Sequence, residues 1–306
     1  MLRDTGLIAI AALIALGLGG CDSRPDPDAG KPTVVVSIPP QGFLVRRIAG
    51  DAVGLHVLVG PDEDPHHYEP TQREMVRVSK AKVYFTTGVD FEEALVGKLR
   101  DLSPDLRIVD TTRGLDLLPM EEHDEHADHG DHDDHNHHDQ AGQMDPHVWL
   151  SPLNAKKQAS LIADHLSKMM PARSVRFQEN LRKLHADLEA LHQDIQEALR
   201  PLKGRTLYVF HPAFGYFAHE YGLEQVAVEA AGKAPGPRRV QQLIDRAKAD
   251  NIKVIFVHPQ FSDAGARAIA REIGGAVVAL DPLAGDYLSN LRRIARAVSK
   301  GLGESP

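Results

Sequence analysis

The chain of 306 residues contains one cysteine, Cys21, and one tryptophan, Trp149. A single cysteine cannot pair within the chain, so packing alone must stabilise the folded part. The apolar run at the N-terminus, Leu7 to Leu18, has twelve residues and is too short to span a bilayer. The sequence also lacks the H-E-x-x-H motif of zinc proteases and the G-x-S-x-G motif of serine hydrolases. These absences count against a disulfide-stapled fold, a membrane-spanning start and two common classes of hydrolase.

Acidic residues outnumber basic ones by 43 to 35, and the formal net charge is −8. Nine of the acids lie in one stretch, Glu121 to Asp139, which has no lysine or arginine. The rest of the chain is therefore near neutral. Because nucleic-acid binding needs a basic surface, we expect no nucleic-acid partner.

The N-terminus is typical of an exported protein. Arg3 precedes the apolar run, and Leu18-Gly19-Gly20 leads directly to Cys21. This arrangement resembles the lipobox of bacterial lipoproteins, whose cysteine carries the lipid anchor of the mature protein. We therefore expect a signal peptide at 1–21, lipidation of Cys21 and a flexible tether at 22–32. A cleaved signal peptide with a chance cysteine is the alternative.

Seven histidines lie among the carboxylates of the acidic stretch. They are His123, His126, His129, His132, His135, His137 and His138. Imidazole is the commonest metal ligand, and carboxylates around it raise the local cation concentration. Because such residues cannot build a packed core, 121–140 is predicted to be a solvated, mobile loop that gathers metal with low affinity. A solvated acidic tract without a ligand is the alternative.

From Thr33 onward, short β-branched runs alternate with helical stretches. The strand candidates are Thr33 to Ile38, Leu55 to Val59, Val83 to Thr86, Arg107 to Val109, Thr206 to Phe210, Val226 to Glu229, Lys253 to Val257 and Ala276 to Leu280. The helix candidates are Gly42 to Ala49, Gln72 to Lys80, Phe91 to Leu102, Arg239 to Ala249, Ala264 to Ile273 and Tyr287 to Lys300. Apolar strands that alternate with helices indicate an α/β protein with parallel sheets.

One longer helix breaks this alternation. Between Pro171 and Pro201, apolar residues recur three or four positions apart, at Leu181, Leu184, Leu188, Leu191, Ile195 and Leu199. This spacing makes one apolar stripe on a helix roughly 42 Å long. The stripe lies between two α/β halves, so it is predicted to link two lobes rigidly. A coiled-coil dimer seam is the alternative.

Four proline-flanked turns place a histidine or a carboxylate after a strand or at a turn. They are Asp64-Pro65-His66-His67-Tyr68-Glu69-Pro70, Asp145-Pro146-His147-Val148-Trp149-Leu150-Ser151-Pro152, Val209-Phe210-His211-Pro212 and Leu280-Asp281-Pro282-Leu283. Ligands of open α/β sheets bind beyond the carboxyl ends of the strands. Three imidazoles and one carboxylate suit a tetrahedral Zn²⁺.

Together with Ala231 to Pro235, these motifs resemble those of the metal-binding lipoproteins of bacterial ABC transporters, the ZnuA-like and TroA-like group (cluster A-I). The resemblance runs from about Thr33 to the C-terminus. It implies two α/β lobes, at 33–170 and 202–306, joined by one rigid helix at 171–201, with the metal in the cleft between the lobes. It also implies a non-enzymatic, monomeric receptor.

The resemblance, carried over motif by motif, implies four metal ligands: His66, His147, His211 and Asp281. The family motif has one variable residue between its histidine and its tyrosine, which selects His66, and His67 is the alternative ligand.

His258 directly follows the strand candidate Lys253 to Val257, at a position where relatives often carry a glutamate, so an accessory role for His258 stays open. Manganese importers of this group mostly have a glutamate at the position of His211. An imidazole there favours zinc.

These expectations combine into an extracytoplasmic receptor, anchored to a membrane through Cys21, that captures Zn²⁺ and delivers it to an ABC permease. A zinc-dependent hydrolase and a metal-buffering surface adhesin are the alternatives. A catalytic zinc keeps one position open for water, whereas Asp281 is expected to supply a fourth ligand here.

Overall fold

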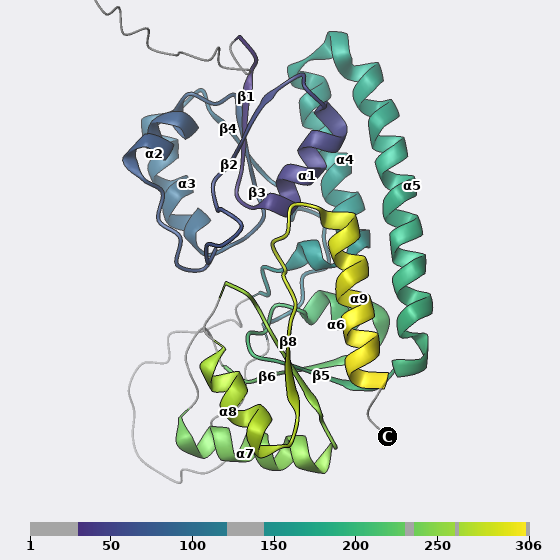
Figure 1. Ribbon diagram of the computed structural model, residues 1–306. Coiled ribbons are helices and arrows are strands. Elements are labelled where there is room, and N and C mark those ends of the chain that lie inside the picture. Colours follow the sequence, from purple (N-terminus) through teal and green to yellow (C-terminus); the bar gives the residue numbers. More distant parts are fainter. Residues whose placement is uncertain (1–29, 121–143, 230–235, 261–262, 304–306) are drawn as a thin grey trace, which may run out of the picture.

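Two α/β lobes lie along one long helix in the computed structural model of the chain (Figure 1). The structure describes residues 30–120, 144–229, 236–260 and 263–303. The predicted signal peptide with Cys21, most of the tether, the His-rich run and the motif Ala231 to Pro235 lie outside the described residues. Among the described helices, none has the length and apolar character needed to cross a membrane.

The first sheet is parallel, with the strand order β2-β1-β3-β4. Its strands are β1 (Thr33–Val36), β2 (Gly54–Val57), β3 (Val83–Thr86) and β4 (Arg107–Asp110). The helices of this lobe are α1 (Pro39–Ala49), α2 (Gln72–Ser79), α3 (Phe91–Leu102) and α4 (Pro152–Met169). Val34, Val35 and Val36 of β1 are fully buried, as expected for a strand that is covered on both faces.

The second sheet repeats this arrangement in the order β6-β5-β7-β8, again parallel. Its strands are β5 (Thr206–Val209), β6 (Glu224–Ala227), β7 (Val254–Val257) and β8 (Ala276–Ala279). The helices of this lobe are α6 (Gly215–Tyr221), α7 (Pro237–Ala249), α8 (Ala264–Glu272) and α9 (Tyr287–Gly303). The α/β class with two parallel sheets, predicted from the sequence, is confirmed.

Most predicted elements differ from the observed ones by up to three residues at an end, and some differences have a clear physical cause. Strand β6 begins at Glu224, two residues earlier than expected, because an edge strand accepts polar residues that a buried strand would not. Helices α4 and α6 were not predicted. The buried face of α4 includes the small side chains Ala155, Ala159 and Ala163, which give only a weak apolar periodicity.

The long helix α5 (Ser174–Leu199) connects the two lobes. It has 26 residues, or about 39 Å at 1.5 Å per residue, and it lies between the 3-10 turns η2 (Pro171–Arg173) and η3 (Arg200–Leu202). Every residue of the predicted stripe is buried, and Phe177 joins it. The helix packs against α1 and α4 of the first lobe and α9 of the second. Because the stripe is covered within the chain, it is not available as a dimer seam.

The packing around α5 also unites the cores of the two lobes. One continuous cluster of buried apolar side chains includes residues of both sheets together with α1, α4, α5 and α9. A second cluster fills the space between the second sheet and helices α7 and α8. The lobes are therefore packed on one shared core, and α5 is its central element.

A buried polar network lies at the carboxyl ends of β1 and β3. The carboxylate of Glu92, in α3, accepts a hydrogen bond from the hydroxyl of Ser37, which follows β1. The backbone N–H groups of Thr87 and Gly88 donate to the same carboxylate over 2.9 Å and 2.7 Å. These bonds hold the loop between β3 and α3, which ends at Asp90.

Burial raises the pKa of Glu92 to about 7, and the hydrogen bonds from Ser37, Thr87 and Gly88 oppose that shift. Asp110 adds to the shift through its charge, and the hydroxyl of Tyr84 bonds to Ser37 at the same place. Because the folded state holds this proton more tightly than the unfolded state, Glu92 stabilises the fold at low pH. That stability is lost as the pH rises from about 4.5 through 7.

Between pH 5 and pH 8, we expect the unfolding free energy of the wild type to fall by up to about 3 kcal/mol more than that of Glu92→Gln. Urea denaturation at several pH values, with a chelator present, measures this. Glu93→Gln is the matched control, because Glu93 is the exposed neighbour on the same helix. Equal pH dependence in the wild type and Glu92→Gln would contradict the assignment.

Candidate metal centre

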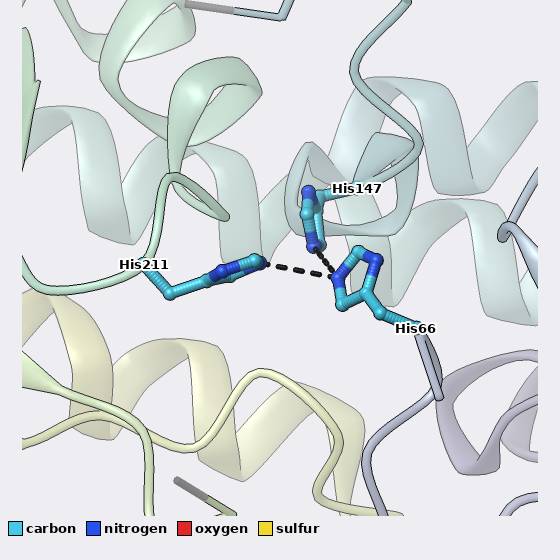
Figure 2. A group of neighbouring side chains, drawn as sticks. All are labelled: His66, His147 and His211. Carbon is cyan, nitrogen blue, oxygen red and sulfur yellow. Dashed lines mark hydrogen bonds between the residues drawn. The ribbon is translucent and has the colours of Figure 1, made fainter. Parts of the chain in front are cut away.

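Three imidazoles from three separate loops meet between the two lobes (Figure 2). His66 lies in the loop after β2, His147 lies directly before the 3-10 turn η1 (Val148–Leu150), and His211 lies two residues after β5. Nε2 of His66 is 3.2 Å from Nε2 of His147 and 3.1 Å from Nε2 of His211. Potential ligand atoms of all three residues lie within 4.8 Å of one another.

Each of the three imidazoles is paired with a carboxylate on its other nitrogen. Nδ1 of His66 is 2.9 Å from Oδ2 of Asp90, and Nδ1 of His147 is 2.7 Å from Oδ1 of Asp145. Nδ1 of His211 forms a short contact with Oε1 of Glu229.

A carboxylate fixes the proton of a neutral imidazole at Nδ1, which leaves a lone pair at Nε2. The three rings therefore present three lone pairs to one point.

The spacing of these nitrogens fits a tetrahedral cation. Imidazole nitrogens bind Zn²⁺ at about 2.0–2.1 Å, so two of them on one tetrahedral ion lie roughly 3.3–3.4 Å apart. The two measured separations of 3.1 Å and 3.2 Å are close to this value. Three lone pairs held at such distances repel one another, and a cation between them removes the repulsion. The arrangement is therefore suited to a small divalent metal ion.

Short turns orient the rings of His66 and His147. The backbone N–H of His66 donates to Oδ1 of Asp64 over 2.9 Å, and the N–H of His147 donates to Oδ1 of Asp145 over 2.9 Å. In both Asp-Pro-His motifs the aspartate thus closes a tight turn around a proline, which fixes the backbone before the histidine. The Asp-Pro-His motif thus serves the same purpose in both places, which is to fix the turn before the histidine.

Burial sets the protonation of the centre. His147 is almost fully buried, and desolvation, followed by the charges of His66 and His211, holds the pKa of His147 well below its usual range. Burial raises the pKa of Asp145 to about 7, against the hydrogen bond from the N–H of His147. Asp90 is half-exposed, and its hydrogen bond to His66 lowers the pKa of Asp90. A cation at the three imidazoles would favour the ionised form of all three carboxylates.

The structure selects His66 rather than His67 for this group. The side chain of His67 is 75% exposed, and its Nδ1 is 2.5 Å from the carboxylate of its own loop residue Asp64. That hydrogen bond raises the pKa of His67, which favours its charged form. His67 therefore faces solvent.

Asp281 lies outside the group of three imidazoles. Its Oδ1 accepts hydrogen bonds from Nε2 of Gln260, over 2.8 Å, and from the backbone N–H of Leu283, over 2.9 Å. The cavity at the centre is lined by Pro65, His66, His147, Trp149, His211, His258, Gln260, Pro282 and Leu283. Asp281 as a ligand stays a prediction.

His258 lines the same cavity. Its ring lies edge-on to His211, with ring centroids 5.3 Å apart, and edge-on to Phe214. Burial, followed by the charges of His211 and the other two imidazoles, holds the pKa of His258 well below its usual range. His258 is thus a neutral ring that packs against His211.

Sequence reasoning did not identify the carboxylate partners of His66 and His211. Asp90 precedes α3 and Glu229 follows β6, and neither belongs to a motif with a histidine. Glu229 follows an edge strand of the second sheet, next to β5, and this position is the only sequence signal it carries. Asp145 was visible because it stands two residues before His147.

The His-rich run leaves and rejoins the described chain beside the centre. Pro119 and Met144 form an antiparallel bridge, and the N–H of Asp145 donates to the carbonyl of Leu118 over 2.8 Å. The described residues on either side of the segment 121–143 are therefore joined directly before His147. The accessory ligands from His123 to His138 themselves lie outside the described residues and stay predictions.

Gly215 of the second lobe leaves space for the carboxylate of Asp145, which belongs to the first lobe. A Cβ atom at Gly215, the first residue of α6, would lie 2.5 Å from Oδ2 of Asp145. The hydroxyl of Tyr216 also donates to the carbonyl of Asp145, over 3.1 Å. The partner of His147 is thus enclosed by the start of α6.

Residues 34–301 match the family model described as ZnuA, zinc-uptake complex component A, periplasmic. The chain belongs to this family. The zinc-binding lipoprotein AdcA of Streptococcus pneumoniae is 31% identical over 280 residues, which cover 90% of this chain and 54% of AdcA. The chain thus spans about half the length of that relative.

The high-affinity zinc uptake protein ZnuA of Bacillus subtilis is 30% identical over 295 residues, which cover 92% of this chain and 89% of that protein. A crystal structure of a ZnuA deletion mutant with zinc bound is 36% identical and superposes with a TM-score of 0.80, covering 90% of this chain and all of that one. The resemblance to the ZnuA-like group is confirmed.

We predict that Gly215→Ala weakens metal binding by about 10- to 100-fold, because the added methyl displaces Asp145 from His147. A competition titration with a zinc chelator measures this. Gly97→Ala in α3 is the matched control, because a Cβ there meets no atom within 4 Å. Unchanged affinity in Gly215→Ala would show that Asp145 does not orient His147.

Proposed function

We propose that this chain is the extracytoplasmic zinc-binding receptor of a metal ABC importer, and that His66, His147 and His211 hold the Zn²⁺ that it delivers to a permease. The observation that carries the proposal is the convergence of three imidazoles whose Nδ1 atoms are all paired with carboxylates. Membership of the ZnuA family and the names of its zinc-binding relatives support it.

Zinc fits the ligands better than manganese or magnesium. Carboxylate, carbonyl and water oxygens suit magnesium and manganese, whereas imidazole suits zinc and other late transition metals. Three imidazole nitrogens in a buried cavity form a nitrogen-rich site, and Asp281 would add one oxygen. Cu²⁺ and Ni²⁺ bind such sites as well, so the choice of zinc over these metals rests on the family.

A receptor explains the surroundings of the site better than a hydrolase does. A hydrolase needs a carboxylate or imidazole free to activate a metal-bound water. Here Asp90, Asp145 and Glu229 are all on the Nδ1 side of the imidazoles, behind the metal position. The cavity itself is lined by Pro65, Trp149, Pro282 and Leu283 as well as by histidines. Apart from the three paired imidazoles, His258 is the one ionisable group among these lining residues, and its ring packs edge-on against His211 and Phe214.

The remaining parts of the chain fit the same function. Cys21 would carry the lipid that anchors a monomer outside the cytoplasmic membrane. The seven histidines of the His-rich run would gather Zn²⁺ weakly. Because the run is joined to the described chain directly before Asp145 and His147, it would release the ion beside the tight site.

We predict that His66→Ala, His147→Ala and His211→Ala each weaken tight zinc binding by more than about 100-fold, since even the loss of an outer partner costs about 10- to 100-fold. Asp281→Ala should cost less, because water can take its place. His67→Ala is the matched control and should bind as the wild type does. Isothermal titration with a competing chelator measures all five, and a silent His66→Ala with a damaged His67→Ala would reverse the assignment.

The same variants test the transport role. In a bacterium that lacks its own zinc receptor, the wild-type chain and its cognate permease should restore growth in chelator-treated medium, and His147→Ala should not. Tight zinc binding without rescue by the wild type would favour the surface-adhesin alternative, in which metal is buffered rather than imported, and equal rescue by both chains would contradict the role of His147.

The loop and the tight site should be separable. We expect deletion of residues 122–140 to remove weak zinc binding and to leave one tight site. Trp149 reports on that site, because its ring lies 5.3 Å from the ring of His147 and it is the single tryptophan. Its fluorescence should change with the first equivalent of zinc and not with later ones. Loss of the tight site in the deletion would contradict this division of roles.

A further inference from the structure

One glutamine bridges the two lobes at the edge of the metal cavity. Gln260 stands three residues after β7, and its Nε2 donates to the carbonyl of Pro61 over 2.9 Å and to Oδ1 of Asp281 over 2.8 Å. Pro61 belongs to the loop of the first lobe that carries His66. Asp281 belongs to the second lobe and is fixed there by the N–H of Leu283.

The two acceptors determine the orientation of this amide. A carbonyl and a carboxylate can only accept, so Nε2 must face both of them and Oε1 must lie on the other side. Oε1 of Gln260 is buried and has no hydrogen-bond partner among the described residues, and Gln260 lines the metal cavity. Buried polar atoms without a partner are few in native proteins, and this one lies at the metal cavity.

The two loops of the first lobe that carry His147 and His66 are joined to the second lobe in different ways. On the side of His147, the indole N–H of Trp149 donates to the carbonyl of Pro282 over 2.8 Å, and the hydroxyl of Tyr287 donates to the carbonyl of Trp149 over 2.5 Å. Both bonds are buried.

On the side of His66, the loop meets the second lobe at the contact between His66 and His211 and at the bond between Gln260 and Pro61. That bond is exposed. The loop that carries His66 is therefore the side that can separate from the second lobe at lower cost.

We propose that Gln260 is a positioning residue of the metal site, which holds the loop of His66 against the second lobe and thereby sets how fast bound metal leaves. This inference rests on the proposed function. Dissociation requires the His66 loop to move away, which breaks the bond between Gln260 and Pro61. The bond joins the His66 loop to the second lobe only while the loop lies against that lobe, so it stabilises the metal-holding arrangement and slows release more than capture.

The experiment measures both rate constants on the full mature chain loaded with one equivalent of Zn²⁺. Excess chelator starts release, and Trp149 fluorescence follows it. Gln260→Leu removes both donated hydrogen bonds at similar side-chain size. Release breaks the bond to Pro61, and about 1 kcal/mol for that bond corresponds to roughly a 5-fold faster release, with the association rate constant within about twofold of the wild type.

Gln241→Leu is the matched control. The amide of Gln241 also donates to an aspartate, Asp245, over 2.9 Å, but both residues lie on the exposed face of α7. Gln241→Leu should release Zn²⁺ at the rate of the wild type. Gln260→Ala provides a second variant, and the thermal unfolding of the metal-free proteins verifies that each variant folds as the wild type does.

The outcomes separate the two claims. If the wild type binds Zn²⁺ tightly and Gln260→Leu and Gln260→Ala release it at the wild-type rate, the role of Gln260 is wrong and the proposed function stands. A rise in the release rate of Gln241→Leu, or equal changes in the release and association rate constants, also overturns the role. If the wild type itself does not bind Zn²⁺ tightly, the proposed function fails and the role of Gln260 fails with it.

Discussion

The metal centre depends on the pairing of each imidazole with a carboxylate. Without Asp90, Asp145 and Glu229, the three rings could rotate or exchange their protons between nitrogens, and no common point would receive three lone pairs. With them, each Nδ1 holds its proton and each Nε2 faces the same place. The cost is electrostatic, since three lone pairs and a buried carboxyl, Asp145, whose pKa is raised to about 7, are held close together. Only a rigid scaffold can maintain such an arrangement.

Helix α5 supplies that scaffold. Its buried stripe packs against α1 and α4 on one side and α9 on the other, so the loops of the two lobes are fixed with respect to each other by apolar packing far from the metal. Apolar packing is insensitive to pH and to metal, and it therefore keeps the imidazoles together whatever their charge. The buried bond between Trp149 and Pro282 extends this rigid connection to the wall of the cavity itself.

The sequence predicted those parts of the fold and site whose signals are local. Strand β3 and helix α3 were predicted to the residue, because β-branched and amphipathic periodicities are read within a few positions. His66, His147 and His211, which the structure brings together, were singled out because each stands beside a proline in a recognisable motif. Asp90, Glu229 and Gln260 were not found, since each acts through a residue that is distant in sequence and near only in the folded chain. Helix α4 was missed because alanines fill its buried face.

A receptor of the proposed kind has to bind its ion tightly and still release it, and the asymmetry of the cavity is suited to both requirements. His147 and His211 are deeply buried, and the wall beside them is joined across the lobes by buried hydrogen bonds, so this side stays fixed. His66 is partly exposed, its partner Asp90 is half-exposed, and its loop meets the second lobe through the exposed bond to Gln260. Loss of one ligand from a tetrahedral shell weakens metal binding far more than a small displacement of every ligand does. With the proposed role of Gln260, release would need the displacement of this one loop, while α5 keeps the two lobes together.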